Sequence, residues 1–136
     1  MAYQIQQLGL ADHAHFYGPL DTARGAAYLQ QCHYLLDTSV REDYPFGVLE
    51  GMAMGLKPVV HDFVGARDIF PPEVLFNTIE QALAMFDEPF APPRYRRFVD
   101  EHYHLNRQVD AYLALLDGLA AHYYPDRFTA ASVEAA

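Results

Sequence analysis

The stretch from His33 to Asp62 reads HYLLDTSVREDYPFGVLEGMAMGLKPVVHD. It begins with a strand-like run at residues 33–37 and ends with a second short strand at residues 58–61. Between these runs, the chain from Phe46 to Leu56 is predicted to be a helix. A strand, a helix and a strand at this spacing predict a right-handed crossover between parallel strands. The stretch therefore predicts an α/β fold with a parallel sheet.

Two carboxylates, Glu42 and Glu50, lie in this stretch after the first strand and around the start of the helix. Open α/β sheets bind ligands at the carboxyl ends of their strands. Carboxylates accept hydrogen bonds from hydroxyl groups, and helix N-termini attract phosphate. The position predicts a ligand that carries both hydroxyls and phosphates, such as a sugar nucleotide. The alternative is a pair of solvated acids that only stabilise the helix start.

Further strands and helices are predicted to alternate on both sides of the stretch. Upstream, we expect a brief strand at His15–Tyr17 and a helix from Asp21 or Thr22 to about Gln31. Downstream, we expect a strand at Val74–Phe76 and a helix from Thr78 to Phe86. Prolines at 89, 92 and 93 predict a linker, and the chain beyond them is predicted to be helical.

Apolar spacing predicts which helix faces are buried. In the helix at 46–56, Phe46, Leu49, Ala53 and Leu56 are expected to face the sheet. Tyr95, Phe98 and Val99 predict a short amphipathic helix. A longer stripe on the last helix predicts core or domain-interface packing, and it consists of Val109, Tyr112, Leu113, Leu116, Leu119 and Tyr123.

The totals fit one globular domain. The chain has 136 residues, 51% of them hydrophobic, and a formal net charge of −9. We therefore expect no binding of nucleic acid. The single cysteine, Cys32, excludes an internal disulfide and favours a cytoplasmic protein. A peripheral position at the inner face of a membrane is the alternative, because Arg94, Arg96 and Arg97 could meet headgroups if they are not simply a solvated helix face.

The cysteine, the lysine and the histidines of the chain each lead to a further expectation. Cys32 is expected to be a buried small apolar residue. Lys57, the only lysine, lies at the start of a strand and thus away from the ligand edge. The pairs His13 with His15 and His102 with His104 could each share a zinc ion on a strand, but no four-ligand set accompanies them, and we expect no metal.

The segment from Ser39 to Val60 resembles the signature of the retaining glycosyltransferase family 4, also called group 1. Its elements here are Glu-x7-Glu, at Glu42 and Glu50, followed by the run EGMAMGLKPVV at 50–60. Residues 13–18 are similar to the family's Val-x-Phe-x-Gly strand and turn, and VGARD at 64–68 resembles its Gly-Gly-x-x-Glu loop. The resemblance covers roughly residues 5–120 and implies the C-terminal, donor-binding half of a GT-B fold, a Rossmann-like three-layer domain that ends in C-terminal helices.

The resemblance also implies residue roles in transferring a hexosyl group, with retention, from a nucleoside diphosphate sugar to an acceptor hydroxyl. Glu50 would hold the ribose hydroxyls, and Glu42 would be the catalytic contact to the transferred sugar. Backbone N–H groups of Phe46 and Gly47 would meet the diphosphate. Gly65 and Ala66 would line the sugar pocket. No metal or other cofactor is implied, because stabilising the leaving diphosphate is electrostatic work.

Arg67 is the candidate cation near the sugar or phosphate, with a surface ion pair as the alternative. The family's Arg and Lys for the diphosphate come from an earlier loop that has no counterpart here. We therefore expect the chain alone to be inactive, with an N-terminal acceptor domain or another transferase chain as partner. The alternative is a non-catalytic nucleotide-binding or interaction module.

Domain limits follow from the same comparison. We expect a partial donor-binding domain at residues 1–124 and a flexible tail at residues 125–136. An incomplete sheet would expose an unpaired strand edge, and this edge predicts a homo-oligomer.

Overall fold

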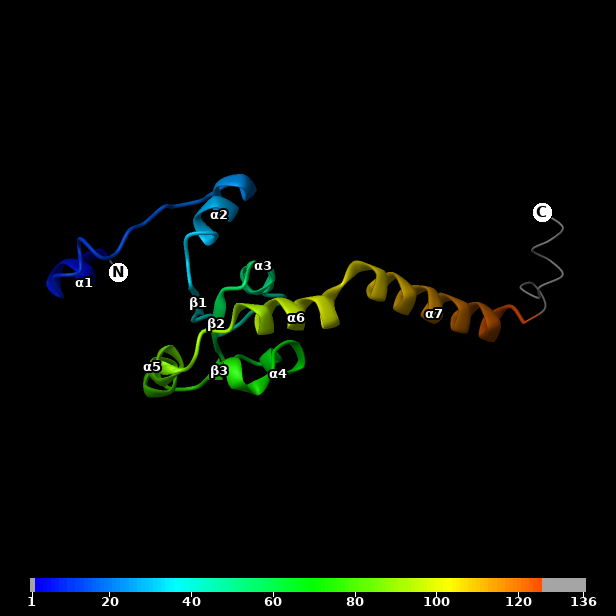
Figure 1. Cartoon of the computed structure of the whole chain (residues 1–136). Helices are drawn as coiled ribbons and strands as arrows, with labels where there is room; N and C mark the ends of the chain where they lie inside the picture. The colour runs from blue at the N-terminus through cyan, green and yellow to red at the C-terminus, as the bar shows by residue number, and fades with distance from the viewer. Residues whose placement is uncertain (1, 126–136) are drawn as a thin grey trace. The chain divides into compact units, whose positions relative to one another are not determined.

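The computed structural model describes residues 2–125. The chain divides into two units at the boundary between Cys32 and His33 (Figure 1). The predicted single domain at 1–124 stays a prediction, and the predicted tail lies, except for Pro125, outside the described residues.

The first unit contains two helices, α1 (Ala2–Gln7) and α2 (Thr22–Leu29). Asp21 caps α2, as predicted, because its Oδ1 accepts a hydrogen bond of 2.8 Å from the Arg24 N–H. The predicted strand at His15–Tyr17 is wrong. Residues 2–32 contain no second strand that could pair with it, and Tyr17 instead packs on the Tyr28 ring at 4.2 Å.

Cys32 is exposed, so its predicted burial is also wrong. No residue among 3–32 is buried, and the end of α2 therefore offers no core for a small apolar side chain. The thiol donates to the Tyr28 carbonyl at 3.3 Å.

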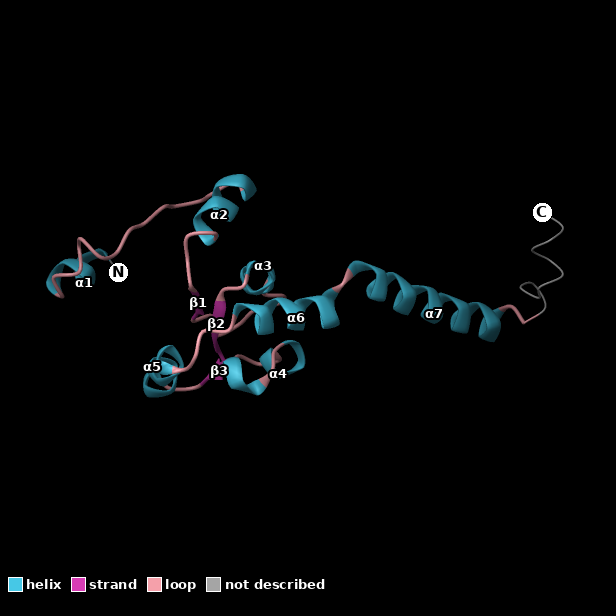
Figure 2. Ribbon diagram, viewed as in Figure 1, coloured by secondary structure: helices cyan, strands magenta, loops and turns pink. Residues whose placement is uncertain are grey.

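The second unit is built on three parallel strands in the order β1-β2-β3 (Figure 2). These strands are β1 (Tyr34–Asp37), β2 (Lys57–His61) and β3 (Leu75–Phe76). Tyr34 pairs with Lys57 at one end of the β1–β2 ladder, and His61 pairs with Phe76 at the end of the β2–β3 ladder. The first four residues of β2 are buried, which is typical of a central parallel strand. The predicted parallel α/β sheet is therefore confirmed.

Helices connect the strands, and further helices come after the last strand in the chain. The connecting elements are α3 (Phe46–Met54), α4 (Ala66–Ile69) and a 3-10 turn, η1 (Pro72–Val74). After β3 come α5 (Ile79–Asp87), α6 (Pro92–Tyr103) and α7 (Leu105–Tyr123). Pro92 and Pro93 belong to the first turn of α6 rather than to a linker, because proline suits the start of a helix, where an N–H has no partner to lose.

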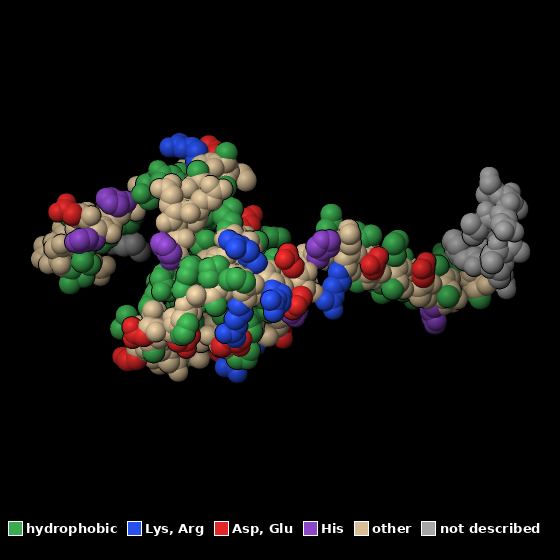
Figure 3. All heavy atoms as spheres, viewed as in Figure 1, with side chains coloured by type: hydrophobic (Ala, Val, Ile, Leu, Met, Phe, Trp, Pro, Cys, Tyr) green, Lys and Arg blue, Asp and Glu red, His purple; other side chains and the backbone are tan. Residues whose placement is uncertain are grey.

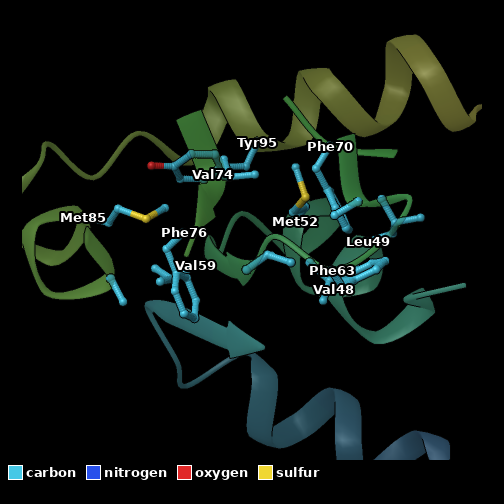
Figure 4. Close-up of a cluster of buried hydrophobic side chains, with 13 residues drawn as sticks. Val48, Leu49, Met52, Val59, Phe63, Phe70, Val74, Phe76, Met85 and Tyr95 are labelled. Carbon is cyan, nitrogen blue, oxygen red and sulfur yellow. The ribbon is translucent and has the colours of Figure 1, made fainter. Parts of the chain in front are cut away.

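The core lies where α3, α5 and α6 meet β2 (Figure 4). Met52 of α3 and Val59 of β2 are almost completely buried, and Tyr95 of α6 closes the cluster. The apolar residues expected in α6 are confirmed, since Phe98 and Val99 pack against the same cluster.

The predicted face of α3 is wrong in part. Leu49 is buried, but Phe46 and Ala53 are exposed, and Val48 and Met52 face the core instead. The helix contacts both the sheet and α6, so its buried arc is rotated from the predicted stripe. It ends at Met54, because Gly55 adopts a left-handed conformation with φ of 92° and donates to the Gly51 and Met52 carbonyls.

Thr78 begins α5 with a capping box. Its hydroxyl accepts from the Gln81 N–H at 3.3 Å, and the Gln81 side chain accepts from the Thr78 N–H at 3.2 Å. Replacing Thr78 by alanine is expected to lower the free energy of unfolding by about 1 kcal/mol, measured by urea denaturation. Thr78→Ser keeps the hydroxyl and should lose only a few tenths; equal losses would assign the effect to the methyl group instead of the cap.

Candidate functional site at the carboxyl edge of the sheet

The three strands end at the same edge of the sheet, at Asp37, His61 and Phe76. The segments that follow them carry the polar side chains of this unit's candidate site. This is the edge at which parallel α/β sheets bind ligands. Lys57, in contrast, lies at the other end of β2, as expected.

Ser39 connects the ends of β1 and β2. Its N–H donates to Asp37 Oδ1 at 2.8 Å, and its hydroxyl donates to Glu42 Oε1 at 3.2 Å. Its carbonyl lies 3.0 Å from His61 Nδ1. A carbonyl only accepts, so the proton is on Nδ1 and His61 is the donor. His61 thus supports the loop after β1, and its Nε2 stays out of this bond.

Glu42 is exposed at this edge, and the Ser39 hydroxyl holds one of its oxygens. The other oxygen, Oε2, has no hydrogen bond within the described chain and can accept from a ligand hydroxyl. A hydroxyl-bearing ligand at the end of β1 would therefore meet an oriented carboxylate.

Glu50 lies one helical turn into α3 and lines a surface pocket of about 310 Å³. Glu42 and Glu50 thus face different neighbours, and no group in the described chain bonds both carboxylates. The Glu50 pocket combines one carboxylate with aromatic and apolar walls from α3, α6 and α7. Its other lining residues are Tyr44, Phe46, Leu49, Ala53, Val99, Tyr103, Leu105 and Gln108.

Tyr103 is a half-buried residue in one wall of that pocket. Burial, and then the neighbouring Tyr44, raise the pKa of the Tyr103 phenol above its ordinary value. The hydroxyl donates to the Ile69 carbonyl at 2.7 Å and so ties α6 to the end of α4. Tyr103 remains a neutral donor that shapes the pocket.

The start of α3 offers one free backbone donor. Phe46 N–H already donates to the Tyr44 carbonyl at 2.9 Å, and Val48 N–H donates to the Pro45 carbonyl at 3.1 Å. Gly47 is exposed, and its N–H has no partner in the described part of the chain. Of the two amides predicted to meet a diphosphate, the structure therefore leaves that of Gly47 available.

The loop after β2 places Gly65, Ala66 and Arg67 near the end of β3. Gly65 has φ of 94°, which favours glycine, whereas Ala66 is fully buried and its N–H donates to the Phe63 carbonyl at 2.9 Å. The Ala66 amide is thus used within the loop, and Gly65 is the more accessible of the two predicted sugar-pocket residues.

Arg67 forms a two-pronged ion pair with Asp62. Its Nη2 lies 2.6 Å and its Nε 3.0 Å from Asp62 Oδ2, and Asn77 Nδ2 donates to the same oxygen at 3.3 Å. The surface ion pair left open by the sequence is therefore present. Asp62 is shielded by this pair, while most of the Arg67 side chain remains exposed.

The pair also sets the acidity of Asp62. The Arg67 hydrogen bonds, aided by Asn77, hold the pKa of Asp62 below its ordinary value although partial burial opposes them. Arg67→Gln is expected to raise the pKa of Asp62 towards its ordinary value, measured by carbon NMR of the carboxyl during acid titration. Because the folded pKa is lowered, the stability from this pair is present above the ordinary pKa and is lost as the pH falls through the folded one. Arg97→Gln, at an exposed position of α6, is the control and should leave the titration unchanged.

Sequence reasoning missed Ser39, Asp62 and Asn77 as members of this edge. Each one follows a strand within two residues, and that position is the signal that could have found them. Their partners could not be read from the sequence, because Asp62 and Asn77 are brought together by strand pairing.

The described residues contain no group of three or more His, Cys, Asp or Glu side chains that could hold a metal ion. The His102–His104 pair is used differently: His102 Nδ1 donates to the Phe98 carbonyl at 2.9 Å, and His104 Nδ1 accepts from the Asn106 N–H at 3.3 Å. In residues 2–125, no helix is long and apolar enough to cross a membrane.

The three-stranded parallel sheet and its connecting helices define a Rossmann-like α/β domain. The model of the family "Glycosyl transferases group 1" matches residues 1–82, and the chain belongs to this family. The match includes Glu42, Glu50 and the Gly65 loop, while α6 and α7 lie outside it. Comparisons with curated proteins and with solved structures find no match.

Proposed function

We propose that this chain binds the donor of a retaining glycosyl transfer, a nucleoside diphosphate sugar, at the carboxyl edge of its sheet. Family membership supports glycosyl transfer in general. The observation that carries the donor proposal is the exposed Glu42 carboxylate, oriented by the Ser39 hydroxyl at the end of β1. In the family resemblance, this carboxylate contacts hydroxyls of the transferred sugar.

Each part of the donor, namely the sugar, the ribose and the diphosphate, is assigned to its own contacts in this chain. Glu42 binds hydroxyls of the transferred hexosyl group, and Glu50 binds the ribose hydroxyls inside its half-apolar pocket. Gly47 N–H, at the start of α3, meets the diphosphate. Gly65 borders the sugar, and no metal takes part. On transfer to an acceptor hydroxyl, the diphosphate leaves with additional negative charge, which this amide and the α3 dipole favour.

Few cations lie at this edge: Arg41 follows β1 beside Glu42, and Arg67 lies in the loop after β2. Arg67 is the cation of the loop after β2, and Asp62 already neutralises it. Lys57 lies at the opposite edge and is engaged by α5. We therefore propose that transfer needs cations from a partner, either an acceptor-binding domain or another transferase chain. A reducing, cytoplasmic setting is part of this proposal, since the chain has one cysteine.

The neutralised Arg67 favours a second candidate function, a nucleotide-binding module that does no chemistry. Both functions require donor binding and differ in sugar transfer. The second is supported if the chain binds the donor yet releases no sugar from it when a complete partner is added.

A thermal-shift panel of nucleoside diphosphates and their hexose conjugates tests donor binding by the full chain. The matching compound is expected to stabilise the fold by about 2.7 kcal/mol at a concentration 100 times its Kd. Because the sugar has its own contact at Glu42, the conjugate should stabilise more than the bare diphosphate. If no compound in the panel shifts the transition, the donor proposal is wrong.

A further inference from the structure

The last helix, α7, presents large apolar side chains that remain largely exposed, and at its start Leu105 borders the Glu50 pocket. None of its residues is buried, although the helix is 19 residues long. Its large apolar side chains are between 45 and 68% exposed. Figure 3 shows such side chains along this helix. Helices in proteins gain most of their stability from packing an apolar face. The exposed face of α7 therefore indicates that another protein surface packs against it.

The spacing of these side chains describes a narrow helix–helix contact. Six of them recur in alternating steps of four and three residues, which is the a/d pattern of a coiled coil. We name this row the α7 seam, and it consists of Leu105, Val109, Tyr112, Leu116, Leu119 and Tyr123. Leu113 and Leu115 lie beside the seam and widen it.

The charged side chains of α7 lie outside this seam. Its charged side chains are Arg107, Asp110 and Asp117, and in the heptad pattern they fall at the outer b and f positions. The positions flanking the seam are uncharged side chains or histidine: Asn106, Gln108, Leu113, Leu115, Ala120 and His122. Two copies of the helix can therefore pair without bringing like charges together, whereas the chain as a whole, at −9, repels its own copies elsewhere.

The same charges argue against a membrane surface as the partner. Helices that lie on membranes carry several Lys or Arg residues on their polar face. The polar face of α7 has one arginine and two aspartates. An anionic surface would thus be repelled rather than attracted.

We propose that the α7 seam is an interaction surface for a second copy of this chain. The homodimer forms by packing the two seams against each other, apolar row against apolar row. This contact differs from the sheet-edge association predicted from the sequence, which would pair β1 with a copy of itself.

Light scattering on the full chain, across a range of concentrations, tests the proposal. The wild type is expected to have twice the 15.4 kDa mass of one chain. The double variant Leu116→Glu with Leu119→Glu should weaken the dimer by roughly 100-fold, since each change places a charge at the centre of the contact. Neither leucine belongs to the core, so the variant should keep the urea midpoint of the sheet unit.

Matched variants separate this contact from others. Ala114→Glu with Ala121→Glu adds the same two charges to the outer face of α7 and should leave the dimer intact. Leu36→Lys, at the exposed position of β1, would disrupt edge pairing and should also leave the α7 dimer intact. A one-chain mass for the wild type at every concentration overturns the proposal, as does a dimer that survives the seam variant but not Leu36→Lys.

Discussion

Replacing Lys57 by methionine is expected to lower the free energy of unfolding by about 2 kcal/mol. The lysine is 4% exposed, and its ammonium donates to the carbonyls of Met85 and Glu88 at the end of α5, the latter at 3.1 Å. Cations are favoured at a helix C-terminus. Methionine fills a similar volume but leaves these carbonyls without their donor. Chemical denaturation followed by circular dichroism measures the loss.

Glu88→Gln is the control that separates the two partners of Lys57. The ammonium also lies 3.4 Å from the Glu88 carboxylate, which is more than half exposed. Exposed ion pairs contribute less than about 1 kcal/mol, so this variant should cost little. If Glu88→Gln is as damaging as Lys57→Met, the carboxylate holds the lysine, and our emphasis on the backbone carbonyls is wrong.

Replacing Glu50 by glutamine is expected to weaken nucleoside diphosphate binding by about 10- to 100-fold. Hydrogen bonds to a charged group are each worth about 1.5–3 kcal/mol, and the proposed ribose contact loses its charge. The loss should be the same for the bare diphosphate and for its sugar conjugate, because both contain the ribose. Titration calorimetry with the compound selected in the thermal-shift panel gives both constants.

Glu42→Gln distinguishes the two carboxylates. It should weaken binding of the sugar conjugate and leave the bare diphosphate unaffected, because Glu42 is assigned to the sugar. Glu73→Gln is the matched neutral control, since Glu73 is an exposed carboxylate that precedes β3 and pairs with Arg94. An equal loss in Glu73→Gln and Glu50→Gln would mean that overall charge, and not the proposed contact, determines affinity.

Much of the sheet unit could be predicted because its signals are local. The run Tyr34–Leu36 is apolar and bounded by polar residues, and Thr78 is a good N-cap. Such features act through neighbouring residues and need no knowledge of the rest of the fold. The crossover rule predicted that the strands would be parallel.

The errors arose where tertiary packing decides. The strand expected at His15–Tyr17 has suitable residues but no strand to pair with in its unit. The buried face of α3 depends on α6, which contacts that helix from 40 residues away in the chain, and so Met52 is buried where Ala53 was expected. Periodicity in a short helix cannot report a second packing partner.

In the candidate site, too, local features could be predicted from the sequence, whereas tertiary contacts could not. The position of Glu42 was predicted because a strand end is a local feature, whereas Gly47 was named through the resemblance to the family signature. That Ser39 orients Glu42, and that Asp62 occupies Arg67, depends on side-chain contacts that spacing does not reveal. The second contact matters most, because it changes Arg67 from a candidate phosphate ligand into a neutralised one.

Backbone NMR of the full chain, titrated with the selected sugar nucleotide, tests the central claim most directly, because it locates the ligand on the fold. The account predicts that the largest amide shifts occur at the carboxyl edge, at Ser39, Glu42, Gly47 and Glu50, with Gly65 among them. A second pocket, of about 500 Å³, lies on the opposite side of the unit, with Lys57, Arg94 and Tyr95 in its wall. Shifts concentrated around that pocket, with the carboxyl edge unchanged, would contradict the account.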